Sequence, residues 1–249
     1  MTPIAIEDVP PVGRAEATSL AATEYDRFAA LLRALPPEAW DLPTDCTRWS
    51  VKDVAAHIVG ETEAFASPRE FVHQWLPAAR VRREVGSPWL IDGVNEVQVR
   101  DRRTSSPAEL VARLAAAAPR STRSRARLPR PLRAVPVFFP PPIGRRTVAY
   151  LVDLVITRDV WMHRVDIARA TGADLVLTAA HDGRIIADVV ADWAGTHPDP
   201  FLLQLTGPAG GTYGRGAVAA PAALDAVDFV RTVSGRERGE GVLARPLPL

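Results

Sequence analysis

The segment from Val148 to Ile167 has the apolar spacing of a buried helix, yet it carries acids and a histidine on its apolar face. In a helix, Asp159 and His163 project about 40° from each other around the axis. Asp166 returns to the same face three residues later. The apolar residues of that face are Leu151, Val155 and Met162. A buried carboxylate is costly unless a partner compensates its charge, so the fold must supply such a partner.

A metal ion completed by a histidine from another helix would be such a partner, and His57 is the candidate. Ser50 and Asp53 have the spacing of a capping box, which predicts a helix from Ser50 to about Ser67. His57 lies beside the apolar stripe of this helix and faces inward. A single inward histidine is more often part of a core than a ligand. Glu61, one turn further, is an extra ligand, a general base or an acid on the helix surface.

The Asp159–His163 pair has two interpretations. It is an ion pair on a helix surface, or it is part of a metal site. Two histidines and one carboxylate leave coordination positions open, as a catalytic metal requires. Asp166 either orients a ligand histidine or forms a salt bridge with Arg164 or Arg169.

Composition excludes several classes of protein. The net charge of +1 argues against strong attraction to nucleic acid or an anionic membrane. The single cysteine, Cys46, excludes an internal disulfide and a cysteine-rich metal site, and we expect it to be buried. No uninterrupted apolar stretch has membrane-spanning length, and the first twenty residues do not resemble a signal peptide. We expect a soluble cytoplasmic protein without nucleic-acid or membrane partners; nothing in the sequence indicates its oligomeric state.

Helical patterns fill most of the chain, and strands are expected only near its end. The helix that carries Asp159 and His163 is predicted to span Thr147–Gly172. The other predicted helices, besides the one from Ser50, are Ser19–Leu35, Pro88–Arg103, one beginning after Ser106, Ala179–Ala194 and Pro221–Val233. The predicted strands are Phe201–Thr206 and one within Gly210–Ala219. The sequence thus predicts a mostly α protein, with a four-helix bundle over residues 1–174 and a small α+β domain over residues 175–249.

An arginine-rich segment, Pro119–Arg146, holds eight arginines and no acid. Such a segment is able to bind phosphate or nucleic acid. Because no aromatic residues are interleaved among the arginines, we favour an extended loop packed along the bundle.

These motifs, in this order, resemble the mycothiol-dependent maleylpyruvate isomerase family within the DinB-like helical bundles. DCTRWSVKDVAAHIVGE is similar to the family segment with the first metal histidine. YLVDLVITRDVWMHRVDIARATG is similar to the segment with the acid and the second histidine. LTGPAGGTYGRG, LDAVDFVRTVSGR and GVLARPLPL resemble parts of the family's small C-terminal domain.

The resemblance implies a bundle whose core holds a divalent metal, usually zinc, with His57, Asp159 and His163 as the protein ligands. The family more often has glutamate at the acid position, so Asp159 is a departure by one methylene. The family's C-terminal domain also contributes an arginine to the active site, and Arg236 is the best match here. Arg236 is therefore expected to bind the substrate or the thiol, and Asp166 to assist catalysis by orienting a histidine.

The resulting hypothesis is a zinc-dependent enzyme that adds the thiol of mycothiol to an unsaturated or electrophilic small molecule. In the isomerase, the resemblance implies thiolate addition to a cis double bond, rotation and elimination; relatives transfer the thiol instead. The sequence does not choose between isomerase and S-transferase chemistry. The alternative is a non-catalytic protein that binds a small ligand in the same bundle.

Overall fold

The computed structural model describes residues 3–196, 198–218 and 220–247. The chain divides into two compact units. We call Ala17–Arg133 with Asp159–Leu175 the bundle unit, and Met1–Glu16, Ala134–Arg158 and Val176–Leu249 the mixed unit. The division after residue 175 lies next to the predicted boundary, but residues 1–16 and 134–158 join the mixed unit instead of the bundle.

Two sets of interactions explain why these segments belong to the mixed unit. Strand β1 (Ile4–Ala5) pairs in parallel with β5 (Gly211–Arg215) of the later sheet. Arg158, which is buried, donates to Asp188 at 2.6 Å and to Asp192 at 2.8 Å, and the Tyr150 hydroxyl also donates to Asp192. Local sequence patterns do not reveal either set of contacts, because the partners are thirty or more residues apart.

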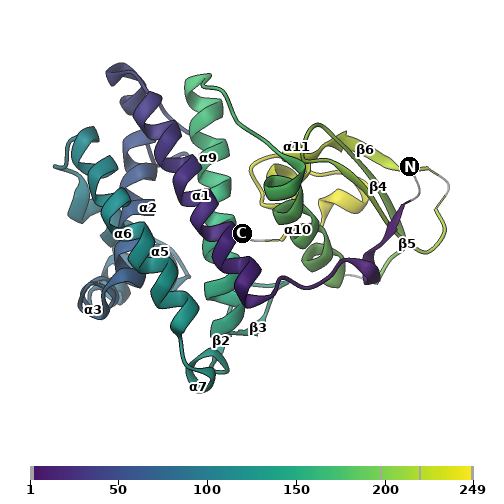
Figure 1. Cartoon of the computed structure of the whole chain (residues 1–249), viewed down its shortest axis with the longest axis horizontal. Coiled ribbons are helices and arrows are strands. Elements are labelled where there is room, and N and C mark those ends of the chain that lie inside the picture. The colour runs from purple at the N-terminus through teal and green to yellow at the C-terminus, as the bar shows by residue number, and fades with distance from the viewer. Residues whose placement is uncertain (1–2, 197, 219, 248–249) are drawn as a thin grey trace. The chain divides into compact units, whose positions relative to one another are not determined.

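The fold is mostly α with a smaller mixed part, as the sequence predicts. The helices, most of which are labelled in Figure 1, are α1 (Arg14–Ala34), α2 (Val51–Ala66), α3 (Pro68–Trp75), α4 (Ala78–Glu84), α5 (Leu90–Arg102), α6 (Pro107–Arg127), α7 (Arg130–Arg133), α8 (Val148–Tyr150), α9 (Ile156–Thr171), α10 (Arg184–Gly195) and α11 (Ala226–Val233). The further strands are β2 (Pro136–Phe138), β3 (Arg145–Thr147), β4 (Phe201–Thr206) and β6 (Ala222–Asp225).

The core of the bundle unit comes from α1, α2, α6 and α9. The buried side chains that these helices contribute include Phe28, Leu32, Ile58, Val59, Leu110, Leu114, Val160 and Ile167. Reciprocal capping boxes fix the starts of two of the helices, Ser50 with Asp53 at α2 and Ser106 with Glu109 at α6. Each box satisfies backbone N–H groups that a helix start would otherwise leave unpaired.

The long helix expected from Thr147 to Gly172 is interrupted by a π-helical turn. Residues Leu151–Val155 (η3) adopt this wider geometry between α8 and α9. Such turns shift the register of the side chains that follow and occur often at functional sites. Gly172 ends α9 with a φ of 69°, a left-handed conformation that glycine adopts without steric cost.

The prediction of an extended loop over residues 119–146 is wrong for its first third. Helix α6 continues through Pro119 to Arg127. Ala117, Ser121 and Arg125 are buried at helical spacing, so the inward stripe persists beyond the proline and retains the helix. Strands β2 and β3 then form an antiparallel pair.

In the mixed unit, four strands form a sheet in the order β1-β5-β4-β6. Alternate residues of β4, beginning with Phe201, are buried, and Trp193 of α10 packs edge-on against Phe201 and against Phe229 of α11. The helix predicted from Pro221 is wrong at its start, since residues 222–225 pair with β4 as β6. Asp225 then caps α11.

Two helices of the bundle unit, α3 and α4, were not predicted. Each is at most eight residues long, too short for a clear helical period, and the exposed face of α3 also carries the large apolar side chains of Phe71, Val72 and Trp75. Over the residues described, no helix combines the length and apolar character needed to cross a membrane.

A buried ion pair in the bundle unit gives the first prediction. Arg164 donates to both oxygens of Glu24, at 2.6 and 3.2 Å, and both side chains are almost fully buried. Glu24→Ala leaves the guanidinium charge without this carboxylate, so the free energy of unfolding should fall by about 3–5 kcal/mol. Urea denaturation measures the change.

The control is Glu84→Ala, which removes a carboxylate shared by two exposed ion pairs, with Arg80 and with Arg100. Its free energy of unfolding should change by about 1 kcal/mol or less. Equal changes in the two variants would contradict a specific role for the buried pair.

Candidate metal centre

Three polar side chains from two helices that are distant in sequence meet inside the bundle unit. His57 lies on α2, and Asp159 and His163 lie one turn apart on α9; one donor atom from each is within 4.8 Å of the others. His57 Nε2 is 3.0 Å from Asp159 Oδ2, and His163 Nε2 is 3.6 Å from Asp159 Oδ1. The two imidazoles are nearly edge to face, with centroids 5.1 Å apart. This geometry is the one that a shared cation requires.

The residue before the α2 cap covers both imidazoles. The Trp49 ring centroid is 5.0 Å from that of His57 and 6.2 Å from that of His163. Because Trp49 directly precedes the capping residue Ser50, the capping box that starts α2 also places this cover. An apolar ring beside the site excludes water and strengthens the electrostatic interactions there.

Hydrogen bonds on the far side of each ring orient it. His163 Nδ1 is 3.0 Å from Asp166 Oδ2, and His57 Nδ1 is 2.7 Å from Gln98 Oε1. A carboxylate oxygen only accepts, so His163 Nδ1 carries a hydrogen and Nε2 is the nitrogen turned toward Asp159. This contact between Asp166 and His163 Nδ1 is the one that the orienting role of Asp166 requires.

The charges in the site are coupled. Burial alone would lower the pKa of His163, but the negative charge of Asp159 and the hydrogen bond to Asp166 raise it well above its usual value. Burial raises the pKa of Glu61 well above its ordinary value, and the charge of Asp159 raises it further. Without a cation, the site therefore favours added protons.

Glu61 is not an acid of the helix surface, which corrects one sequence interpretation. Its Oε2 atom is buried and has no hydrogen-bond partner among the residues described. A carboxylate oxygen in this state is costly unless a proton or cation compensates it. Glu61 is thus a third acidic side chain, beside Asp159 and Asp166, and its buried oxygen fits a positively charged occupant.

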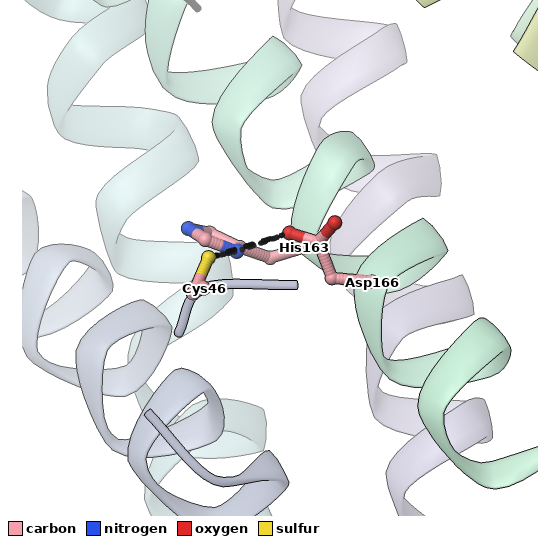
Figure 2. A group of neighbouring side chains, drawn as sticks. All are labelled: Cys46, His163 and Asp166. Atoms are coloured by element: carbon pink, nitrogen blue, oxygen red, sulfur yellow. Dashed lines mark hydrogen bonds and ion pairs between the residues drawn. The ribbon is translucent and has the colours of Figure 1, made fainter. Parts of the chain in front are cut away.

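Cys46 approaches the site from the loop before α2, which the sequence did not indicate. Figure 2 shows its sulfur beside His163 and Asp166, 3.9 Å from His163 Nδ1 and 3.7 Å from Asp166 Oδ2. A turn holds it there: Thr44 Oγ1 accepts from the Cys46 amide and donates to the Trp49 carbonyl. The Cys46 side chain is half-buried. Its sulfur lies beside Asp166 and the Nδ1 side of the His163 ring, not beside Nε2.

Arg236 lies in the mixed unit, just after α11. Its Nη1 donates to Ser234 Oγ at 3.3 Å, and Gly235 between them has a φ of 85°, as expected for a helix cap. The role of Arg236 in the site stays a prediction.

The donor set fits a divalent cation such as zinc. Two imidazole nitrogens and a carboxylate are typical ligands of catalytic zinc, with further positions left for water or substrate. Tetrahedral ligands at about 2.0–2.1 Å from an ion lie about 3.3 Å from each other. The two distances to Asp159, 3.0 and 3.6 Å, lie on either side of this value.

The fold defines a helical bundle with an appended mixed unit, and its donor cluster is one that a divalent cation fits. Comparison with known proteins gives the family. The sequence model described as "Mycothiol maleylpyruvate isomerase N-terminal domain" matches residues 21–168. Because this match spans more than half of the chain, the chain belongs to that family, which confirms the resemblance seen in the sequence.

Two solved structures share the fold. A mycothiol-dependent maleylpyruvate isomerase matches with a TM-score of 0.56 and 17% identity, over 95% of this chain and 93% of that chain. A histidine-to-alanine mutant described by the same name matches with a TM-score of 0.57 and 16% identity, over the same shares. No curated protein sequence matches the chain. At these identities the likeness establishes the fold alone.

The donor cluster predicts stabilisation by metal. Chelator-treated protein should gain thermal stability when Zn²⁺ is added, because an ion that binds only the folded state stabilises it. At a free concentration of about 100 times Kd, the gain is about 2.7 kcal/mol. His163→Ala removes one donor and should abolish the gain, as measured by differential scanning fluorimetry.

His73→Ala is the matched control. His73 is an exposed histidine that contacts Asp101 at 2.8 Å, away from the donor cluster. Its variant should gain stability as the original protein does. If His163→Ala also gains as much, His163 is not a ligand.

Proposed function

We propose that the chain is a metal-dependent enzyme that uses mycothiol to isomerise a cis double bond in a small molecule. The convergence of donor atoms from His57, Asp159 and His163 within 4.8 Å carries this proposal. Membership of a family described as mycothiol maleylpyruvate isomerase supports it. A divalent cation held by these side chains, most simply zinc, would supply the positive charge that stabilises a thiolate at neutral pH.

The side chains of the site prepare the two imidazoles for this task. Asp166 holds the hydrogen of His163 on Nδ1, so that its Nε2 lone pair is available toward Asp159. Trp49 covers both rings and keeps water away from that side. Asp159 has a shorter side chain than the glutamate expected at this position, so its placement depends closely on the backbone of α9.

The proposed reaction needs no co-reactant besides the thiol. The thiolate sulfur forms a bond to one carbon of the cis double bond, and the π electron pair moves to the other carbon as a stabilised carbanion. The resulting single bond rotates, and the same electron pair then re-forms a trans double bond as the carbon–sulfur bond breaks and the thiolate leaves. The thiol proton must leave before addition. We propose that Glu61 accepts it, because its buried Oε2 has no partner among the described residues and lies one helical turn from His57.

Assays with maleylpyruvate and mycothiol test the function. The zinc-loaded protein should produce the trans isomer while the mycothiol concentration stays constant. His163→Ala should lose zinc, measured by elemental analysis, together with activity. Full zinc occupancy in an active His163→Ala protein would refute the proposed ligand role.

The same assay separates the other hypotheses. Consumption of mycothiol in step with a thioether product, for example with monobromobimane as electrophile, would identify an S-transferase. A protein that binds zinc and a small ligand but turns over neither substrate would be a binding protein instead.

Arg236 is proposed to bind a carboxylate of the substrate. A hydrogen bond between charged groups contributes about 1.5–3 kcal/mol, so Arg236→Ala should lower kcat/KM about 10–100-fold, mainly through KM. Zinc content should not change. Arg238→Ala, two residues further and exposed, is the control and should retain kcat/KM. An unchanged KM in Arg236→Ala would exclude this role.

A further inference from the structure

A chain of buried amide groups leads away from His57 on the side opposite to Asp159. His57 Nδ1 is 2.7 Å from Gln98 Oε1 on α5. Gln98 Nε2 donates to Gln74 Oε1 on α3 at 2.8 Å. Gln74 Nε2 in turn donates to the Gly60 carbonyl and to Glu70 Oε1, each at 2.9 Å. All of these contacts lie within the bundle unit, and both glutamine side chains are almost fully buried.

The direction of every hydrogen bond in this chain follows from its far end. A backbone carbonyl and a carboxylate can only accept, so the group of Gln74 that faces Gly60 and Glu70 must be its NH₂. Gln74 therefore presents its oxygen to Gln98, and Gln98 must present its NH₂ in return. The remaining oxygen of Gln98 faces His57, so His57 Nδ1 must carry the hydrogen and Nε2 the lone pair in the neutral ring.

The far end of the chain is held by charge. Arg102 is buried and donates to Glu70 Oε1 at 2.7 Å and to Glu63 Oε2 at 2.5 Å. Burial alone would raise the pKa of Glu70, but hydrogen bonds from Gln74 and Arg102 lower it below its ordinary value. Glu70 thus stays ionised near neutral pH and remains an acceptor. Arg102 Nη1 also donates to the Gln98 carbonyl at 3.0 Å, so the same guanidinium contacts both Glu70 and the backbone of α5.

A glycine makes the close approach of α5 possible. A Cβ atom at Gly60 would lie 2.6 Å from Gln98 Cβ and 2.9 Å from Arg102 Nη1. Real side chains do not approach so closely, so any other residue at this position would displace Gln98 from His57. Gly60 thus provides both an acceptor for Gln74 and the space for Gln98.

The contact between Asp159 and His57 Nε2 explains why the position of the hydrogen on His57 needs to be controlled. A carboxylate 3.0 Å from His57 Nε2 favours a hydrogen on that nitrogen, which is the wrong tautomer for a metal ligand. We propose that Gln98, with its orientation set by Gln74, is a positioning residue that holds the His57 hydrogen on Nδ1 and leaves Nε2 free to bind a divalent cation. This inference rests on the metal site of the proposed function.

Zinc affinity of the full chain, measured by competition with a chromophoric chelator, tests the proposal. Gln98→Met keeps the length of the side chain but removes the acceptor, and should weaken zinc binding about 10–100-fold. Gln98→Glu, protonated on the oxygen that faces Gln74 Oε1, keeps both the donor to Gln74 and an oxygen acceptor opposite Nδ1, and should bind within about threefold of the original protein. A merely structural role predicts that both substitutions weaken binding alike.

We call the hydrogen bonds from Gln74 through Gln98 to His57 the relay, and a double-mutant cycle tests its direction. Gln74→Met touches neither zinc nor a ligand, but it frees the Gln98 amide to rotate, and should weaken zinc binding on its own. In the Gln98→Met background it should cause no further loss, because Gln74 acts only through Gln98. Losses that multiply in the double variant would overturn the relay.

Nitrogen-15 NMR of the zinc-loaded protein gives an independent signature. His57 should show a protonated Nδ1 and a coordinated Nε2, and coordination through Nδ1 would overturn the proposal. Gln204→Met, the third glutamine of the chain and exposed on β4, is the control for the substitution and should bind zinc as the original protein does.

The outcomes separate the relay from the proposed function. If the original protein binds zinc and Gln98→Met binds it equally well, the relay fails while the metal site stands. If the original protein binds no zinc, the metal site fails and the relay fails with it.

Discussion

Two imidazoles and a carboxylate face one another inside the bundle unit, with His57 and His163 buried and Asp159 partly exposed, and several neighbouring side chains of the unit position them. Each imidazole nitrogen lies 3.0 or 3.6 Å from an oxygen of Asp159, and such lone pairs repel unless a proton or cation lies between them. The surroundings favour that positive charge: Glu61 is buried nearby, and Asp166 and Gln98 accept from the outer nitrogens of the rings. The capping box of α2 and the turn at Thr44 bring Trp49 and Cys46 against the same rings.

The features that could be predicted from the sequence are those that depend on local spacing. The four-residue separation of Asp159 and His163, the box at Ser50 and Asp53, and the alternation in Phe201–Thr206 each specify an element or face without reference to the rest of the chain. Their convergence with His57 could be proposed because a buried carboxylate needs a partner. Family resemblance supplied the assignment of His57, Asp159 and His163 as metal ligands.

The features that could not be predicted depend on contacts between distant segments. Gln74 and Gln98 look like ordinary polar residues of helices, and only the close approach at Gly60 makes them a relay. Cys46 is 117 residues from His163, and no spacing rule relates them. Residues 222–225 form a strand only because β4 offers a free edge, and a short segment of this composition reads equally well as the first turn of a helix. Such elements are decided by tertiary pairing.

X-ray absorption spectroscopy of the zinc-loaded full chain, without thiol, tests the central claim most directly. The account predicts a first shell of nitrogen and oxygen atoms at about 2.0–2.1 Å, outer-shell scattering from two imidazoles, and no sulfur. A sulfur ligand at about 2.3 Å would place Cys46 on the ion. That result, or scattering from fewer than two imidazoles, would contradict a site built on His57, Asp159 and His163.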